Sequence, residues 1–139
     1  MHDQQIISDA TILNTHLRID NVLIIGEVYR KQGKYEEALE VDTKSLDIKT
    51  RIYGGDVTGD NHLDVAALYN NIGTVYESLG KYEEALEMHS KSLDIKTRIL
   101  GGDNHPDVAA SIKNIGIVYH NKGDRAAATE MYTGIPYIP

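Results

Sequence analysis

One stretch of this chain occurs twice, almost letter for letter. Residues 35–51 read YEEALEVDTKSLDIKTR and residues 82–98 read YEEALEMHSKSLDIKTR, so only three positions differ between the two copies. A chain made of near-identical units folds as a stack in which each unit packs on its neighbours, and not as one globule around a unique site. Its function therefore has to be sought on the surface that stacking creates.

A set of spaced small and aromatic residues extends the repeat to three copies. Each copy has a glycine, a tyrosine three residues later, a second glycine and then an alanine. The three sets are Gly26, Tyr29, Gly33 and Ala38; Gly73, Tyr76, Gly80 and Ala85; and Gly116, Tyr119, Gly123 and Ala128. Copies one and two are 47 residues apart and copies two and three 43, because the first linker is longer. Extra residues at a surface turn disturb such a stack least.

Apolar residues in copy two recur at steps of three and four, which predicts two amphipathic helices. The two helical faces are Val65, Leu68, Ile72, Val75, Tyr76 and Leu79, then Tyr82, Ala85, Leu86, His89, Leu93 and Leu100. Gly80 stands between them, where a left-handed C-cap is needed, and Pro106 suits the first turn of the next helix. The unit is therefore an antiparallel helix pair, in which small residues at Gly73 and Ala85 let the backbones approach closely.

Oppositely charged side chains four residues apart support the second helix of each of the first two copies. These pairs are Glu40–Lys44, Asp47–Arg51, Glu87–Lys91 and Asp94–Arg98.

The Gly/Tyr/Gly/Ala signature resembles the tetratricopeptide repeat over roughly residues 17–133. The long period and the phrase GDNHPDVA at 102–109 are similar to the extended repeat of kinesin light chains. The resemblance implies an all-α, right-handed α-solenoid of three antiparallel helix pairs. We expect one repeat domain: repeat one with an N-terminal extension at about 9–53, repeat two at 64–100, a degenerate repeat three at 107–133 and an irregular tail at 134–139.

The resemblance also implies a binding surface. In tetratricopeptide arrays the first helix of each pair lines a concave groove, and bound peptides lie across it. The register from Gly73 gives the groove residues Leu23, Glu27 and Arg30 in copy one, Asn70, Thr74 and Glu77 in copy two, and Lys113, Ile117 and His120 in copy three. Asn70 lies in Asn-Asn-Ile, which is similar to the Asn-Asn-Leu of kinesin light chains, where a groove asparagine contacts the peptide backbone. We expect a non-catalytic scaffold that binds a peptide or protein segment.

Copies one and three depart from this pattern, because Leu23 and Lys113 replace the asparagine. The groove also lacks the regular basic and asparagine positions with which some family members hold the C-terminal carboxylate of chaperones. Binding of chaperone tails is therefore not expected.

Composition excludes several other classes of function. The net charge of −7 argues against non-specific binding to nucleic acid and favours a basic protein partner. The chain has no cysteine, which excludes disulfides and thiolate metal sites. No apolar run approaches the roughly 20 residues of a membrane span, and no secretion signal is evident. We expect a cytoplasmic protein that contacts neither membrane nor nucleic acid.

Two His-x-Asp motifs, His62-x-Asp64 and His105-Pro-Asp107, recur at the same place in copies two and three. A histidine and a carboxylate at this spacing could hold a metal or act in acid–base chemistry. Their position between a linker and a helix favours a role in helix capping. The chain has no phosphate-binding loop, and its Ser, His and Asp residues are scattered, so we expect neither enzyme activity nor a cofactor. His89 falls where the repeat usually buries an aromatic residue and is expected to be a partly buried packing residue.

The C-terminal end differs most from the repeat. Prolines and a glycine in residues 134–139 should stop the last helix near Tyr132. Apolar residues there would then be partly uncovered, namely Ile112, Ile115, Tyr119, Met131 and Tyr132. We expect this face to self-associate or to take up the apolar tail Ile135-Pro-Tyr-Ile138 of its own or another chain. The alternative to a peptide-binding scaffold is thus a structural, self-assembling fragment of a longer repeat array.

Overall fold

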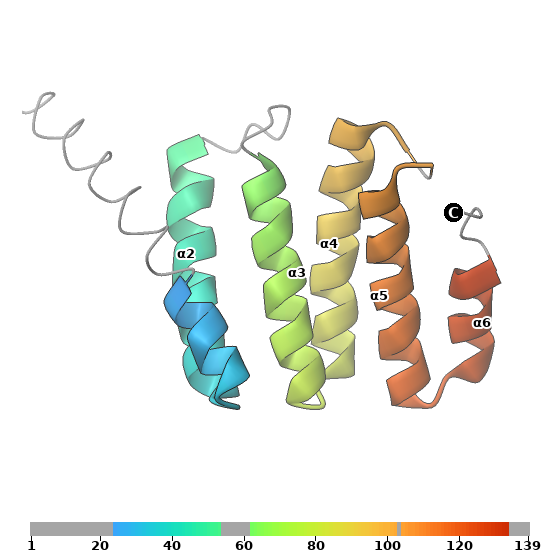
Figure 1. Cartoon of the computed structure of the whole chain (residues 1–139), viewed down its shortest axis with the longest axis horizontal. Coiled ribbons are helices and arrows are strands. Elements are labelled where there is room, and N and C mark those ends of the chain that lie inside the picture. Colours follow the sequence, from blue (N-terminus) through green and yellow to red (C-terminus); the bar gives the residue numbers. More distant parts are fainter. Residues whose placement is uncertain (1–23, 54–61, 103, 134–139) are drawn as a thin grey trace, which may run out of the picture. The chain divides into compact units, whose positions relative to one another are not determined.

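The computed structural model describes residues 24–53, 62–102 and 104–133, and every regular element in these ranges is an α-helix. Residues 24–31 are helical. They are followed by α2 (Tyr35–Tyr53), α3 (His62–Ser78), α4 (Tyr82–Leu100), α5 (Pro106–Lys122) and α6 (Arg125–Thr133) (Figure 1). The prediction of an all-α fold is confirmed. The chain divides into two compact units, Met1–Gly55 and Asp56–Pro139, and each is described by itself.

The second glycine of each copy ends the first helix of the pair with the same turn. Gly33, Gly80 and Gly123 have φ angles of 74°, 75° and 94°, in the left-handed region that glycine adopts without strain. In each copy the next residue donates its backbone N–H to the carbonyl five residues earlier. These bonds are Lys34 to Tyr29 (2.8 Å), Lys81 to Tyr76 (2.8 Å) and Asp124 to Tyr119 (2.9 Å). This Schellman arrangement satisfies carbonyls at the helix end and confirms the predicted left-handed cap at Gly80.

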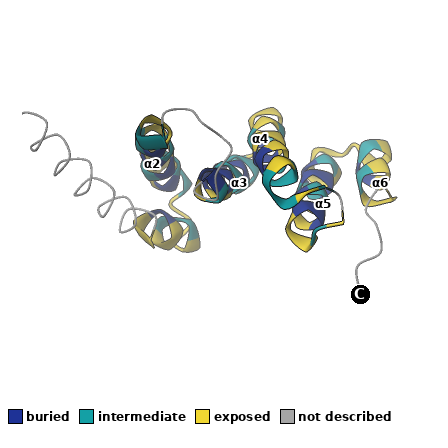
Figure 2. Ribbon diagram, turned by 90° about the horizontal axis from the view of Figure 1, so that it is seen from above, coloured by how far each residue is buried: buried dark blue, intermediate teal, exposed yellow. Residues whose placement is uncertain are grey.

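In the second unit, α3 packs on α4, α4 on α5 and α5 on α6. Each of these helices is buried on part of its surface and exposed on another, as amphipathic helices are (Figure 2). The buried apolar side chains are Val65, Ala66, Leu68, Ile72 and Val75 on α3, Ala85 and Ile95 on α4, Val108, Ala109, Ile115 and Val118 on α5, and Ala128 on α6. The core thus lies between successive helices, and most of the predicted face of α3 belongs to it.

The first glycine of each copy makes room for a side chain from the second helix. A Cβ built on Gly73 would lie 2.9 Å from His89 Nε2, and one on Gly116 would lie 2.7 Å from Tyr132 Cε1. Ala85 is fully buried, as expected for the helix crossing, but the nearest atoms to that Cβ of Gly73 belong to His89. The close approach therefore accommodates the His89 ring, a partner that the sequence reasoning did not name.

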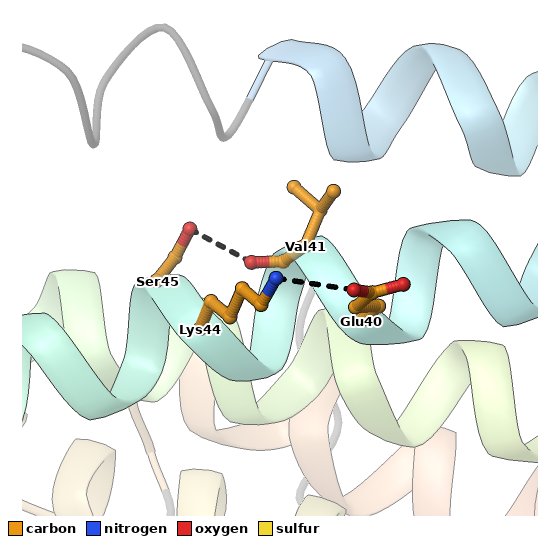
Figure 3. A network of polar contacts seen from close by, with 4 residues as sticks. All are labelled: Glu40, Val41, Lys44 and Ser45. Carbon is orange, nitrogen blue, oxygen red and sulfur yellow. Dashed lines mark hydrogen bonds and ion pairs between the residues drawn. The ribbon is translucent and has the colours of Figure 1, made fainter.

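All four predicted ion pairs along the second helices are present. Their N–O distances are 3.1 Å for Glu40–Lys44, 3.0 Å for Asp47–Arg51, 3.5 Å for Glu87–Lys91 and 3.1 Å for Asp94–Arg98. Figure 3 shows the first of them on α2, beside the bond from the Ser45 hydroxyl to the Val41 carbonyl. Because these pairs are solvent-exposed, each contributes only a few tenths of a kcal/mol to helix stability.

Several sequence-based predictions fall outside the described residues. They concern Leu23, the N-terminal extension from about residue 9, most of the longer linker, and the tail at 134–139. The predicted end of the last helix near Tyr132 falls at the edge of the described range, which closes at Thr133.

Candidate functional site

The predicted groove residues of copies two and three lie on α3 and α5, at helical steps of three and four residues. Lys113 and His120 are exposed, and the other four are half-buried. We use the name α3–α5 face for Asn70, Thr74, Glu77, Lys113, Ile117 and His120. The face is polar except at Ile117.

Two hydrogen bonds between side chains join α3 to α5 along this face. Asn114 donates from Nδ2 to Asn70 Oδ1 over 3.1 Å, and Asn121 donates from Nδ2 to Glu77 Oε1 over 2.6 Å. Both donors belong to α5 and both acceptors to α3, and each set is seven residues, or about two turns, apart. The structure therefore joins the predicted residues Asn70 and Glu77 of copy two to α5 of copy three, through the side chains next to Lys113 and His120.

Asn114 and Asn121 were not among the predicted site residues. Each stands one position after a predicted residue, Lys113 or His120. The signal that could have revealed them is an amide side chain at the edge of the face, long enough to reach the neighbouring copy.

The Asn70 side chain contacts a buried histidine, His89 of α4. His89 Nδ1 is 3.0 Å from Asn70 Oδ1, and the residue is only 1% exposed. Burial, assisted by the positive charge of Lys96, lowers the pKa of His89 from 6.5 to about 4. The imidazole is therefore neutral near pH 7. His89 packs at the aromatic position as predicted, but it is fully buried there and not partly, and it also makes a polar contact with Asn70.

The predicted groove residues of copy one belong to the other unit and are not assigned to the α3–α5 face. Glu27 is exposed and pairs with Lys31 at 3.2 Å. Arg30 is half-buried, and its Nε makes no hydrogen bond. Asp42, at the position of His89 in this copy, is buried. Burial raises the pKa of Asp42 to about 6, although the charge of Arg30 acts in the opposite direction.

The His-x-Asp motif of copy three caps a helix. His105 Nδ1 accepts the backbone N–H of Asp107 at 3.1 Å, and Pro106 occupies the first turn of α5. His62 is buried as the first residue of α3. In the ranges that the structure describes, no three His, Asp or Glu side chains are grouped so as to hold a metal ion. Nor is any described helix long and apolar enough to cross a membrane.

Helix pairs that recur along the chain, each with the same glycine turn, define an α-helical repeat protein. The tetratricopeptide repeat family model matches residues 18–98 and 64–133, and the chain belongs to that family. Tetratricopeptide repeats are generally modules for protein–protein interaction, and the scaffolds they form are generally non-catalytic.

Solved structures with the same fold include kinesin light chain relatives. A crystal structure of a Podosopora anserina putative kinesin light chain has 21% identity and a TM-score of 0.68, covering 85% of this chain and 53% of that one. BtubC (BKLC) from P. vanneervenii has 23% identity and a TM-score of 0.68, covering 87% and 50%. The repeat domain of Arabidopsis FLU has 20% identity and a TM-score of 0.70, covering 85% and 91%.

The chain thus spans about half the length of the first two of these structures. At such identities the likeness shows a shared fold, and the resemblance to kinesin light chain repeats is confirmed at that level. No curated protein matches the chain.

Proposed function

We propose that this chain is a non-catalytic scaffold that binds an extended peptide or protein segment on the α3–α5 face. One observation carries the proposal. The cross-helix bonds hold α3 and α5 together, yet Asn70 Nδ2 and Lys113 Nζ form no hydrogen bond or ion pair with any described residue. Such groups can bind a ligand without first breaking an internal contact, which lowers the cost of association.

An extended peptide suits this surface because its backbone carbonyls recur at regular intervals along the chain. An amide on α3 and an ammonium group on α5 can donate hydrogen bonds to such carbonyls, and Ile117, one turn after Lys113 on α5, offers an apolar contact. The half-buried position of Asn70 also partly shields its hydrogen bond from water, which raises the cost of losing it.

The proposal includes a basic partner and a cytoplasmic location. The net charge of −7 favours basic partners at long range, since opposite charges steer association. A chain without cysteine suits a reducing compartment such as the cytoplasm.

The test uses a random dodecapeptide display library selected on the whole chain. The dissociation constant of a selected peptide is compared between the parent and an Asn70→Ala/Lys113→Ala variant. Loss of the two contacts should weaken binding at least about tenfold. The matched control is Gln32→Ala/Lys34→Ala, which likewise removes one amide and one ammonium group, at exposed positions outside the α3–α5 face, and should leave the dissociation constant within about twofold. Equal affinity of the Asn70/Lys113 variant, with the helical content of the parent, would refute binding at this face.

A second candidate function, self-assembly as part of a longer array, is favoured by one specific observation. Tyr132 on α6 is 40% exposed, whereas His89 at the equivalent position of copy two is 1% exposed. Exposed aromatic surface at the end of a repeat array is suited to packing on a further unit. Light scattering over a wide concentration range tests this function. A mass that rises with concentration would support it, and a constant monomer mass would exclude it.

A further inference from the structure

The side-chain oxygen of Asn70 is already fully used inside the protein. Asn114 Nδ2 donates to Asn70 Oδ1 at 3.1 Å from α5, and His89 Nδ1 lies 3.0 Å from the same oxygen on α4. A carbonyl oxygen has two lone pairs, so two donors complete its hydrogen-bonding capacity. Asn70 is therefore held at one end of its amide by two different helices.

The His89 ring has little freedom to turn away from this contact. The residue is 1% exposed, and its Nε2 edge lies so close to α3 that a Cβ on Gly73 would be only 2.9 Å away. Nε2 itself is buried and has no hydrogen-bond partner. The ring is thus confined with Nδ1 toward Asn70 and Nε2 toward the Gly73 backbone.

The environment of the two ring nitrogens decides which of them carries the proton. With the proton on Nδ1, His89 donates to Asn70 Oδ1, and only an acceptor lone pair on Nε2 stays unpaired. The opposite arrangement turns the Asn70 amide so that Nδ2 donates to His89 Nδ1. The proton would then sit on Nε2, buried without an acceptor, and Asn114 would have to turn as well. Because an unpaired buried donor is strongly unfavourable, the first arrangement is favoured.

We propose that His89 is a positioning residue that fixes the Asn70 amide with its oxygen inward and its Nδ2 hydrogens toward the ligand. The inference rests on the proposed function of the α3–α5 face and specifies the chemistry of its ligand. Asn70 then acts as a hydrogen-bond donor only, and the ligand atom it binds is an acceptor such as a peptide carbonyl oxygen. An arrangement in which Asn70 binds a peptide carbonyl and a peptide N–H together is excluded, since its oxygen is occupied.

This device is specific to copy two. The equivalent residues of the other copies are Asp42 and Tyr132, and neither of them has a ring N–H group. The groove positions equivalent to Asn70 are Leu23 and Lys113, which have no amide to orient. Copy two is therefore the copy in which an asparagine and a histidine stand at these two positions.

The first experiment needs no ligand. Long-range ¹H–¹⁵N NMR correlation of the histidine side chains, with His89 assigned by comparison with a His89→Phe variant, identifies the protonated nitrogen. We expect a neutral ring with its proton on Nδ1 at pH 7. A proton on Nε2 would overturn the inference, whether or not the chain binds any peptide.

The second experiment is a double-mutant cycle with the peptide selected on the whole chain. His89→Phe keeps an aromatic ring beside Gly73 but removes the donor. It should weaken binding about threefold to tenfold when Asn70 is present and less than about twofold in an Asn70→Ala background. His89→Asn keeps an N–H group near the place of Nδ1 and should restore part of the lost affinity.

The outcomes separate this inference from the proposed function. If Asn70→Ala weakens binding but His89→Phe has the same effect in both backgrounds, the face binds peptide and the positioning role is wrong. If no peptide depends on Asn70, the proposed function fails, and the position of the proton on His89 still decides whether the amide is held as described.

Discussion

The ring of His89 occupies the space that Gly73 leaves by having no side chain, with Nε2 2.9 Å from where a Cβ would stand. The same relationship joins Gly26 to Asp42 and Gly116 to Tyr132, always between the first glycine of a copy and the residue sixteen positions later. The glycine is therefore required by a side chain of the opposite helix, and that side chain is different in each of the three copies.

Gly73→Leu should destabilise the protein by at least about 1–3 kcal/mol, because the new side chain must displace a buried ring. The measurement is the midpoint of urea unfolding followed by circular dichroism. Ala67→Leu on the same helix is the control: it adds the same side chain at an exposed position and should shift the midpoint little. An unchanged midpoint for Gly73→Leu would show that His89 can vacate this space at no cost.

His89 should make the second unit less stable in mild acid. Burial lowers the pKa of His89 from 6.5 to about 4, so the folded protein binds this proton more weakly than the unfolded chain. The free energy of unfolding is therefore highest above pH 6.5. It decreases as the pH falls toward 4, by about 3 kcal/mol at most. His89→Phe should remove this part of the pH dependence. Parallel stability–pH curves for parent and variant between pH 4 and 6.5 would contradict the assignment.

Asp42 should show the opposite pH dependence. Burial raises the pKa of Asp42 from 3.8 to about 6, so the folded protein holds this proton more tightly than the unfolded chain. The contribution of Asp42 to stability is greatest below pH 3.8 and is lost as the pH rises to about 6.

Asp42→Asn should therefore stabilise the protein by about 1–2 kcal/mol at pH 7, because an uncharged side chain replaces a buried carboxylate. Glu40→Gln on the same helix removes an exposed carboxylate and serves as the control. A lower unfolding free energy of Asp42→Asn at pH 7 would show that the ionised carboxylate is stabilised in the folded protein, and would contradict the prediction.

Two serines at equivalent positions should respond differently to replacement. The Ser92 hydroxyl donates to the Ala66 carbonyl on α3 at 2.8 Å and is fully buried, whereas the Ser45 hydroxyl donates to Val41 on its own helix at 3.0 Å. Ser92→Ala should cost about 1 kcal/mol, and Ser45→Ala should cost clearly less, because a bond within one turn adds little to helix stability. Urea unfolding of the two variants tests the difference. Equal losses would mean that the hydrogen bond from Ser92 to Ala66 adds no more to stability than the bond within α2.

The serines also show where sequence reasoning ends. Residues 35–51 and 82–98 predict identical helices, and the helices, glycine turns and ion pairs could be predicted because they depend on residues within a few positions of one another. The partner of each serine hydroxyl depends on another element. The residue equivalent to Ala66 in copy one is Ile19, which lies outside the described range.

The candidate site, too, could be predicted only in part from the sequence. Helical periodicity predicted that Asn70 and Glu77 share one helix and that Lys113 and Ile117 share another, and these helices are α3 and α5. The bonds from Asn114 and Asn121 could not be predicted, because they depend on how closely α3 and α5 approach each other. The contact between His89 and Asn70 could not be predicted for a different reason. The family pattern puts an aromatic residue at position 89, and nothing local indicates that a histidine there bonds across the helix pair.

Binding of a peptide along the α3–α5 face can be tested directly by NMR. The most direct measurement is the set of ¹H–¹⁵N chemical-shift changes in the whole chain when a library-selected dodecapeptide is added. We expect the largest changes in backbone amides of α3 and α5 around Asn70, Thr74, Lys113 and Ile117, and in the Asn70 side-chain amide. Largest changes instead around Tyr132, or around Ile24 and Val28, would contradict the claim and place binding on the exposed apolar residues.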